Sequence, residues 1–294
     1  MRDQVQALRE LEDVEVDLWE FPPGASALAR ATRRSLRHLR RRFEVVHAHF
    51  SLSALPALCL RGEVHGLTLH GTDVRHPRTR LVTEAVLPHM DLIVAVSDAL
   101  AAELPAHARN RVEVIPCGVD LRRFRPIPRA EARAALGLAA DSPCLLFPAD
   151  PSRPEKRFHL AEQLATEAGL PLLTLGGVAP ERVPLYVNAA NAVLVTSAAE
   201  GFGLAALEAL SCDVPVLATD VGAHAEILRD VEGALCAPFD LEVWSAALKQ
   251  HTACENPRIS GRPRAAEHSA QRMAARLAEV WRALVSGSGS RASR

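Results

Sequence analysis

The stretch Ala192-Val-Leu-Val-Thr-Ser-Ala-Ala-Glu-Gly-Phe-Gly-Leu-Ala-Ala-Leu-Glu-Ala-Leu-Ser211 carries the pattern that predicts the fold. Its first residues are apolar or β-branched and predict a buried β-strand that ends at Thr196. A loop with Glu200 and two glycines follows, and we expect a helix to begin near Gly203. A short buried strand followed by a loop and a helix is the repeating unit of parallel α/β sheets.

The same alternation of strand and helix runs along the whole chain. Short apolar runs predict further strands over residues 44–48, 66–70, 91–96, 112–116, 144–148, 171–175 and 214–218. Between them lie helical stretches, and Ser97 is a candidate N-cap for the helix over residues 97–104. The predicted fold class is therefore α/β, with two Rossmann-like domains whose parallel sheets face each other across a cleft.

A length of 294 residues gives room for two domains. We expect a first domain over residues 1–125 that is incomplete at its start, a second over 140–265, and a terminal helix over 266–285 that packs back toward the first domain. The segment from Gly118 to Asp141 is rich in Arg and Pro and is predicted to connect the domains. A Ser-, Gly- and Arg-rich tail over 286–294 is the one low-complexity tract.

Composition narrows the class of protein. The net charge of −1 argues against a general nucleic-acid binder, which would carry a basic excess. Six scattered cysteines favour a reducing compartment, with Cys144 and Cys236 expected in the core. The sequence shows no signal peptide and no apolar run of about 20 residues, so we expect a cytoplasmic protein.

The loop after Thr196 has the features of a nucleotide-sugar site. Its glycines let backbone N–H groups approach a ligand closely, and the helix N-terminus favours a phosphate. Glu208, one to two turns into the helix, is placed to accept hydrogen bonds from ribose hydroxyls, and Glu200 from sugar hydroxyls. The alternative is a capping loop followed by a solvated helical glutamate.

The motif E-G-F-G-L-x-x-L-E-A-L, followed by V-P-V-L-A-T-D-V-G, closely resembles the retaining glycosyltransferases of family 4, which have the GT-B fold. Other motifs match in the same order: V-H-A-H-F, L-T-L-H-G-T-D, V-A-V-S, V-I-P-C-G-V-D and Y-V-N-A-A. The resemblance implies metal-independent transfer, without a cofactor, from a nucleotide-diphosphate sugar to a glycan or lipid-linked acceptor. The donor-binding residues it implies are Glu200, Gly201, Phe202, Gly203, Leu204 and Glu208.

Two more groups of site residues are expected from the resemblance. Arg153 and Lys156, in the loop after the strand at 144–148, would neutralise the donor diphosphate, where charge builds as the glycosidic bond breaks. The alternative is a solvated basic loop. His70 would hydrogen-bond the donor sugar, although a histidine at a strand end often has a structural role. For His47 and His49 we favour packing, and no metal site is expected.

The chain departs from the resembled family at its start. Residues 2–9 match the family's first helix, and the strand and glycine-rich loop that usually come before it are not seen. That strand would lie in the centre of the first sheet, so its loss would leave two neighbouring strands unpaired. We expect either a start codon assigned too late or a shortened, inactive form.

Residues 30–42 hold seven arginines and no acidic residue. Such a helix suits peripheral contact with anionic lipid at the inner face of a membrane, and a solvated surface helix is the alternative. Two alternative functions stay open: a truncated, non-catalytic homologue that binds nucleotide sugar as a regulatory partner, and another GT-B enzyme such as a sugar-nucleotide epimerase.

Overall fold

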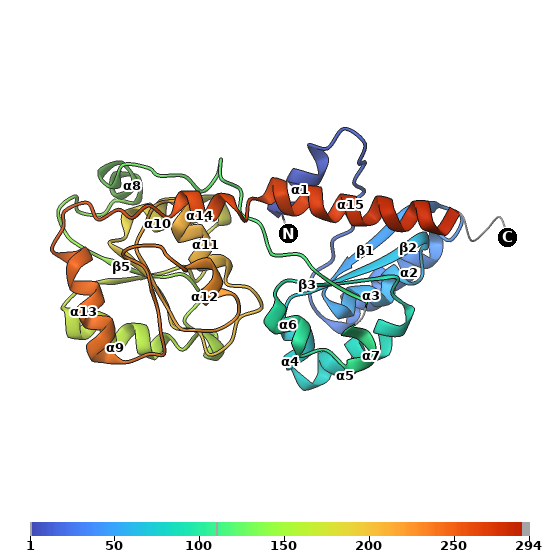
Figure 1. Ribbon diagram of the computed structural model, residues 1–294, viewed down its shortest axis with the longest axis horizontal. Helices are drawn as coiled ribbons and strands as arrows, with labels where there is room; N and C mark the ends of the chain where they lie inside the picture. Colours follow the sequence, from blue (N-terminus) through green and yellow to red (C-terminus); the bar gives the residue numbers. More distant parts are fainter. Residues whose placement is uncertain (1, 110, 290–294) are drawn as a thin grey trace. The chain divides into compact units, whose positions relative to one another are not determined.

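The computed structural model describes residues 2–109 and 111–289, which form two compact units (Figure 1). Unit 1 contains the chain up to Cys117 and from Gln271 onward, and unit 2 contains Gly118–Ala270. Each unit has its own sheet in which every strand pair is parallel. The predicted α/β class, with two Rossmann-like domains, is confirmed.

Unit 1 has a four-stranded sheet with the strands in sequence order. The strands are β1 (Arg42–His49), β2 (Arg61–Leu69), β3 (Leu92–Ala95) and β4 (Val112–Val114). The helices are α1 (Arg2–Arg9), α2 (Ala25–Arg37), α3 (Ser51–Ala57), α4 (Thr72–Arg75), α5 (Pro77–Val86), α6 (Asp98–Ala102) and α7 (Ala106–Arg109), with a 3-10 turn, η1 (Leu87–His89). The expected N-cap is confirmed, because Ser97 Oγ accepts from the Leu100 N–H at 3.2 Å.

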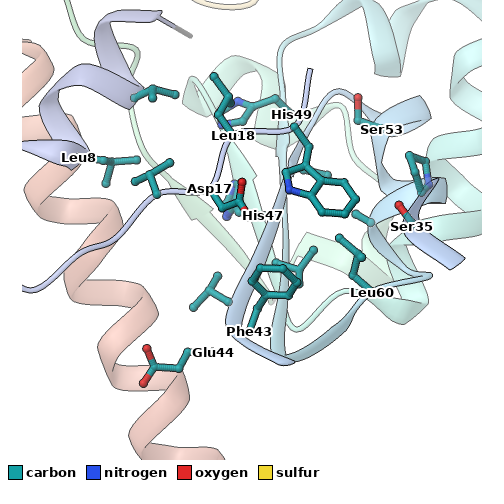
Figure 2. Close-up of a pocket in the computed structure, with 18 of the residues that line it drawn as sticks. Leu8, Asp17, Leu18, Ser35, Phe43, Glu44, His47, His49, Ser53 and Leu60 are labelled. Atoms are coloured by element: carbon teal, nitrogen blue, oxygen red, sulfur yellow. The ribbon is translucent and has the colours of Figure 1, made fainter. Parts of the chain in front are cut away.

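Strand β1 is an edge strand, and among the described residues it pairs with β2 alone. The segment over residues 14–21 is rich in apolar residues, which alternate with acidic residues over 14–18 as in a strand, yet it forms no strand. A cavity of about 860 Å³ lies beside β1 and is lined by both segments. Figure 2 shows Asp17 and Leu18 from this segment and Phe43 and His47 of β1 among the residues that line the cavity. Both segments therefore lack strand partners at this cavity.

Unit 2 has a five-stranded sheet in the order β6-β5-β7-β8-β9. The strands are β5 (Leu145–Phe147), β6 (Leu172–Thr174), β7 (Ala192–Val195), β8 (Val216–Ala218) and β9 (Leu235–Cys236). The helices are α8 (Arg129–Leu136), α9 (Phe158–Ala168), α10 (Val183–Ala189), α11 (Leu204–Ser211), α12 (His224–Ile227), α13 (Leu241–Thr252) and α14 (Arg262–Ala266), with 3-10 turns η2 (Pro154–Lys156) and η3 (Pro180–Arg182).

Helices cover both faces of the unit 2 sheet. Figure 1 shows α9 and α13 on one side of the sheet and α10, α11 and α14 on the other. The core between the sheet and α9 and α13 contains Phe147, Leu164 and Trp244, each at most 1% exposed. Strands buried on both faces explain why β5, β7 and β8 are almost wholly apolar.

The boundary between the units falls earlier than we expected. The Arg- and Pro-rich segment 118–141 is not a free connection, because it packs within unit 2. Phe124 is fully buried, and the buried Arg133 donates to the Ala189 carbonyl at 3.0 Å and to Asn191 Oδ1 at 3.0 Å. Its arginines therefore hold α8 to the rest of the unit.

The end of the chain forms one long helix, α15 (Ala270–Gly289), whose residues from Gln271 onward belong to unit 1. Trp281 of this helix donates from Nε1 to His47 Nδ1 of β1 at 3.0 Å. Arg282 forms an ion pair with Asp13 at 2.6 Å. The tail over 290–294 lies outside the described residues.

Two smaller expectations were wrong. The basic helix expected over residues 30–42 ends at Arg37, and Arg42 already belongs to β1. Arg41 is tied to Asp17 by an ion pair at 2.6 Å, and Arg34 stacks over Trp19 at 4.6 Å. Cys236, expected in the core, is half-buried at the end of an edge strand, whereas Cys144 is buried.

Candidate functional site

The order of strands in unit 2 determines where its candidate site lies. From β5 the chain passes to β6 on one side and then to β7 on the other, so the direction of winding reverses between β5 and β7. Ligands of open α/β sheets bind outside the carboxyl ends of the strands at such a reversal. The loops that follow β5 and β7 carry the predicted residues Lys156 and Glu200.

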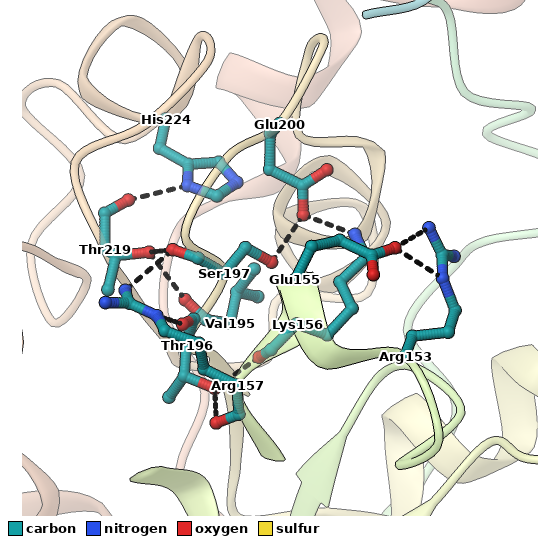
Figure 3. A network of polar contacts seen from close by, with 10 residues as sticks. All are labelled: Arg153, Glu155, Lys156, Arg157, Val195, Thr196, Ser197, Glu200, Thr219 and His224. Atoms are coloured by element: carbon teal, nitrogen blue, oxygen red, sulfur yellow. Dashed lines mark hydrogen bonds and ion pairs between the residues drawn. The ribbon is translucent and has the colours of Figure 1, made fainter. Parts of the chain in front are cut away.

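Lys156 and Glu200 meet directly, as Figure 3 shows. Lys156 Nζ lies 2.5 Å from Glu200 Oε1, and the two side chains are 15% and 14% exposed. Ser197 Oγ donates to the same carboxylate oxygen at 2.6 Å. The structure therefore joins a predicted phosphate-binding cation to a predicted sugar-binding carboxylate at the end of the sheet.

Arg153, the other predicted cation, does not take part in this contact. Its guanidinium pairs with Glu155 at 2.6 Å, and the two side chains are 53% and 45% exposed. Figure 3 shows Arg153 turned toward Glu155, to one side of the Lys156 ammonium. The loop thus presents one half-buried cation and one exposed cation.

The glycine-containing loop is shaped by close backbone contacts. Gly203 has a φ of 123°, and a Cβ there would lie 2.3 Å from His224 Cδ2. At Gly222, which has a φ of 64°, a Cβ would lie 2.8 Å from the Phe202 carbonyl oxygen. The Ala223 N–H donates to that same oxygen at 2.7 Å. Only glycine fits these two positions, so the loops after β7 and β8 pack tightly together.

The remaining predicted donor-binding residues lie along this loop and the start of α11. Phe202 is buried, and its ring packs edge-on with that of His268, with the ring centroids 5.7 Å apart. Gly201, the residue before it, is half-buried. Leu204, the first residue of α11, is 36% exposed, and Glu208 lies half-buried one turn further along. The helix N-terminus and the carboxylate thus lie on consecutive turns of one rigid element.

In unit 1, His70 directly follows β2 and opens a tight turn. The buried carboxylate of Asp73 accepts from the His70 N–H at 3.0 Å and from the Gly71 N–H at 2.8 Å. Burial raises the pKa of Asp73, and these backbone hydrogen bonds oppose that rise. His70 Nε2 lies 3.0 Å from His49 Nδ1, so one of these nitrogens carries a proton that the other accepts.

His47 lies next to His49, and its hydrogen bonds fix one neutral tautomer of its ring. The Trp281 indole can only donate, so His47 Nδ1 must accept, and the proton is on Nε2. That nitrogen donates to Thr68 Oγ1 at 2.7 Å. Burial lowers the pKa of His47 to about 3 and that of His70 to about 4, and it lowers the pKa of His49 well below its usual range.

Several residues of both sites were not predicted from sequence. Ser197, Arg157, Asp73 and the contact between His49 and His70 belong to this group. The H-G-T-D motif gives no clear signal for Asp73, because Asp side chains in turns usually bond backbone groups that follow them, whereas Asp73 accepts from the N–H groups of His70 and Gly71 before it. No local pattern marks Ser197, although its partner Glu200 lies three residues further along the same loop, and the partners of Arg157 come from another loop.

The described part of the chain contains neither a candidate metal centre nor a helix that could span a membrane. Over residues 2–109 and 111–289 no group of three or more His, Cys, Asp or Glu side chains is arranged to hold a metal ion. Within the same ranges no helix is both long and apolar enough to cross a bilayer.

Two parallel sheets in separate Rossmann-like units are the architecture of the GT-B class of α/β proteins. The family model for glycosyltransferase family 4 matches residues 2–123, and that for glycosyl transferases group 1 matches residues 151–268. The chain belongs to the glycosyltransferase family 4 group of proteins.

Among the curated relatives are two proteins named D-inositol 3-phosphate glycosyltransferase. The one from Nocardia farcinica is 29% identical over 75% of this chain and 61% of its own length. The one from Mycobacterium avium is 31% identical over 85% of this chain and 71% of its own length. The chain therefore spans about two thirds of the length of these relatives.

Solved structures share the fold. Anabaena Alr3699/HepE, determined in complex with UDP and glucose, has a TM-score of 0.68 and 18% identity over 88% of this chain and 82% of its own. Sucrose-phosphate synthase from Thermosynechococcus elongatus has a TM-score of 0.63 and 23% identity over 83% of this chain and 74% of its own.

Proposed function

We propose that this protein is a retaining glycosyltransferase that takes its sugar from a nucleotide-diphosphate sugar and requires no metal ion. The observation that carries the proposal is the pairing of Lys156 with Glu200 where the sheet of unit 2 reverses its winding. Relatives named as glycosyltransferases and a structural neighbour solved with UDP-glucose support a nucleotide-sugar donor. They favour this function over a regulatory binding protein.

Each residue of the site has a proposed role. Glu208 accepts hydrogen bonds from the ribose hydroxyls, and the loop from Gly201 to Leu204 receives the diphosphate at the N-terminus of α11. The diphosphate attracts the Lys156 ammonium, which releases the Glu200 carboxylate to accept hydroxyls of the sugar. Arg153 leaves Glu155 to become the second cation. His70 is proposed as a further hydrogen-bonding partner of the sugar.

The resemblance to the retaining family 4 enzymes supports transfer by attack from the front face. The bond between the anomeric carbon and the phosphate oxygen breaks, and the acceptor oxygen bonds to the same face of that carbon. The acceptor proton passes to the departing phosphate oxygen. Lys156 and Arg153 stabilise the charge that develops on the diphosphate, and cations placed in this way contribute on the order of 10²- to 10³-fold to the rate.

The test is release of nucleoside diphosphate from UDP-, GDP- and ADP-sugars in EDTA, with inositol 3-phosphate or a polyprenyl phosphate as acceptor. We expect release with one nucleotide, a product of unchanged anomeric configuration by NMR, and at least a 10²-fold loss in Lys156→Gln. Failure of the folded protein with every donor would refute the transferase proposal, and loss of activity in EDTA would refute metal independence.

We further propose that the acceptor is a lipid-linked or cell-envelope glycan and that residues 30–42 contact anionic lipid. Arg30, Arg33 and Arg37 of α2 are exposed, and Leu36 and Leu39 beside them are 48% and 43% exposed. Each arginine near such a surface contributes about 1 kcal/mol. Changing these three arginines to Gln should weaken sedimentation with phosphatidylglycerol vesicles about 100-fold. Equal binding to neutral vesicles would contradict the contact.

A further inference from the structure

Arg157 follows Lys156 directly and has an unusual backbone conformation. Its φ of 51° and ψ of 51° place it in the left-handed region, which glycine adopts readily and larger residues rarely do. A turn that needed only this backbone shape would be served best by glycine. An arginine in this conformation therefore calls for a compensating role of its side chain.

The side chain of Arg157 spans the two loops of the site, as Figure 3 shows. Nε donates to the Thr196 carbonyl at 2.7 Å, and Nη2 donates to the Ser197 carbonyl at 2.8 Å. These are the first two residues after β7, and Glu200 follows three residues later. The guanidinium thus fixes the start of the loop that carries Glu200.

The second loop is held in return. Thr196 Oγ1 lies 2.9 Å from the Lys156 carbonyl oxygen and 3.1 Å from that of Arg157. The Ala198 N–H donates to the Glu155 carbonyl at 2.8 Å. Hydrogen bonds therefore run in both directions between the loops after β5 and β7, and Arg157 makes two of them with a charged donor, which strengthens them.

We propose that Arg157 is a positioning residue that sets the separation between the Lys156 ammonium and the Glu200 carboxylate. That this separation matters for donor binding rests on the proposed function. That Arg157 sets the separation does not. Without the guanidinium the two loops lose two charge-assisted hydrogen bonds, and they keep the Thr196 and Ala198 contacts and the ion pair of Lys156 with Glu200. Lys156 and Glu200 then lose their fixed spacing, and a displacement of about 1 Å in such groups costs on the order of 10²-fold in rate.

The two lysines of the chain, Lys156 and Lys249, allow a direct test. Lysine-selective isotope labelling of the full chain gives two side-chain NMR signals, and Lys249→Arg assigns them. Lys249 is exposed on α13, so its signal reports whether the unit is folded. We expect Arg157→Gly and Arg157→Gln to move the Lys156 signal toward that of a free lysine and to leave the Lys249 signal unchanged.

The variants separate positioning from stability. Arg157→Gly removes the unfavourable backbone conformation, so its melting temperature should stay near that of the wild type while kcat/KM falls about 100-fold. Arg157→Gln removes the guanidinium but keeps a side chain in the left-handed conformation, so it should shift the Lys156 signal and lower the melting temperature as well. The matched control is Arg182→Gln, because Arg182 also donates to a carbonyl of unit 2, that of Ala135 at 3.4 Å, but outside the site.

Each result decides the inference. A wild-type Lys156 signal in both Arg157→Gly and Arg157→Gln would overturn the positioning role, as would an equal shift in Arg182→Gln. If wild-type Lys156 fails to respond to UDP-, GDP- and ADP-sugars, the proposed function is refuted. A shifted Lys156 signal in Arg157→Gly would then still show that Arg157 positions this side chain.

Discussion

The pairing of Lys156 with Glu200 carries the chemistry at the scale of single residues. Both side chains are about 85% buried, so water screens their charges poorly and each depends on the other. Ser197 adds a hydrogen bond to the shared oxygen. The nearby pair of Arg153 and Glu155 has similar chemistry but is about half exposed, and exposed pairs contribute little to stability.

A double-mutant cycle checks this difference. Removing one partner leaves the other charge about 85% buried without its opposite charge, so Lys156→Gln or Glu200→Gln should lower the free energy of unfolding by about 2 kcal/mol. The double variant should cost less than the sum of the two, with a coupling of about 1–2 kcal/mol. The control cycle on Arg153 and Glu155 should give a coupling below about 1 kcal/mol. Equal couplings in urea unfolding would show that burial does not strengthen the site pair.

The sequence predicted the residue types of the site more fully than their contacts. Glu200 and Lys156 lie in motifs, and the structure brings them together. Arg153 lies in the same motif as Lys156, but it forms an ion pair with Glu155 and does not contact Glu200. Arg157 escaped prediction because its two acceptors are backbone carbonyls of a loop 39 and 40 residues away in sequence, and such contacts leave no local pattern.

At the scale of elements, apolar runs located the strands well but their ends less well. The strand expected over 66–70 begins at Arg61, because parallel pairing with β1 continues back to Arg42. The two-residue strand β9 is too short for a periodic signal. The helix expected over 30–42 ends at Arg37, where β1 requires an extended chain a few residues later.

The histidines at the ends of β1 and β2 predict how stability depends on pH. In the unfolded chain a histidine binds a proton near pH 6.5, whereas His47 and His70 bind one only near pH 3 and 4 in the folded protein. Below pH 6.5 the unfolded state therefore binds more protons, and the free energy of unfolding falls. Each histidine contributes up to about 1.4 kcal/mol per pH unit.

Urea unfolding between pH 7.5 and 4.5, followed by tryptophan fluorescence, measures this slope. In His47→Gln one titrating group is gone. The slope of the free energy of unfolding against pH should therefore be smaller by the contribution of one proton, up to about 1.4 kcal/mol per pH unit. The substitution also removes the acceptor of the Trp281 indole, which lowers stability at every pH without changing the slope. A slope equal to that of the wild type would contradict the buried neutral state of His47.

At the scale of the whole molecule, the alternation of strands and helices was enough to predict two units with parallel sheets. The boundary between them was not predictable from composition. Arg- and Pro-rich segments are typical linkers, but here Arg133 is buried among backbone carbonyls and Phe124 among apolar side chains of unit 2. The order of the strands in unit 2 decides which loops form the site, and order follows from long-range packing rather than from any local pattern.

The central claim is that unit 2 binds a nucleotide-diphosphate sugar without a metal ion. Its most direct test is thermal unfolding of the full chain in EDTA with UDP-, GDP- and ADP-sugars. Binding to the folded state at about 100 times Kd should raise Tm by roughly 5–10 °C with one nucleotide. Glu208→Ala should abolish the rise, whereas Glu242→Ala, an exposed glutamate of α13, should retain it. The account would be contradicted if none of the donors raised the Tm of the folded protein. It would also be contradicted if the donor raised the Tm of Glu208→Ala as much as that of the wild type.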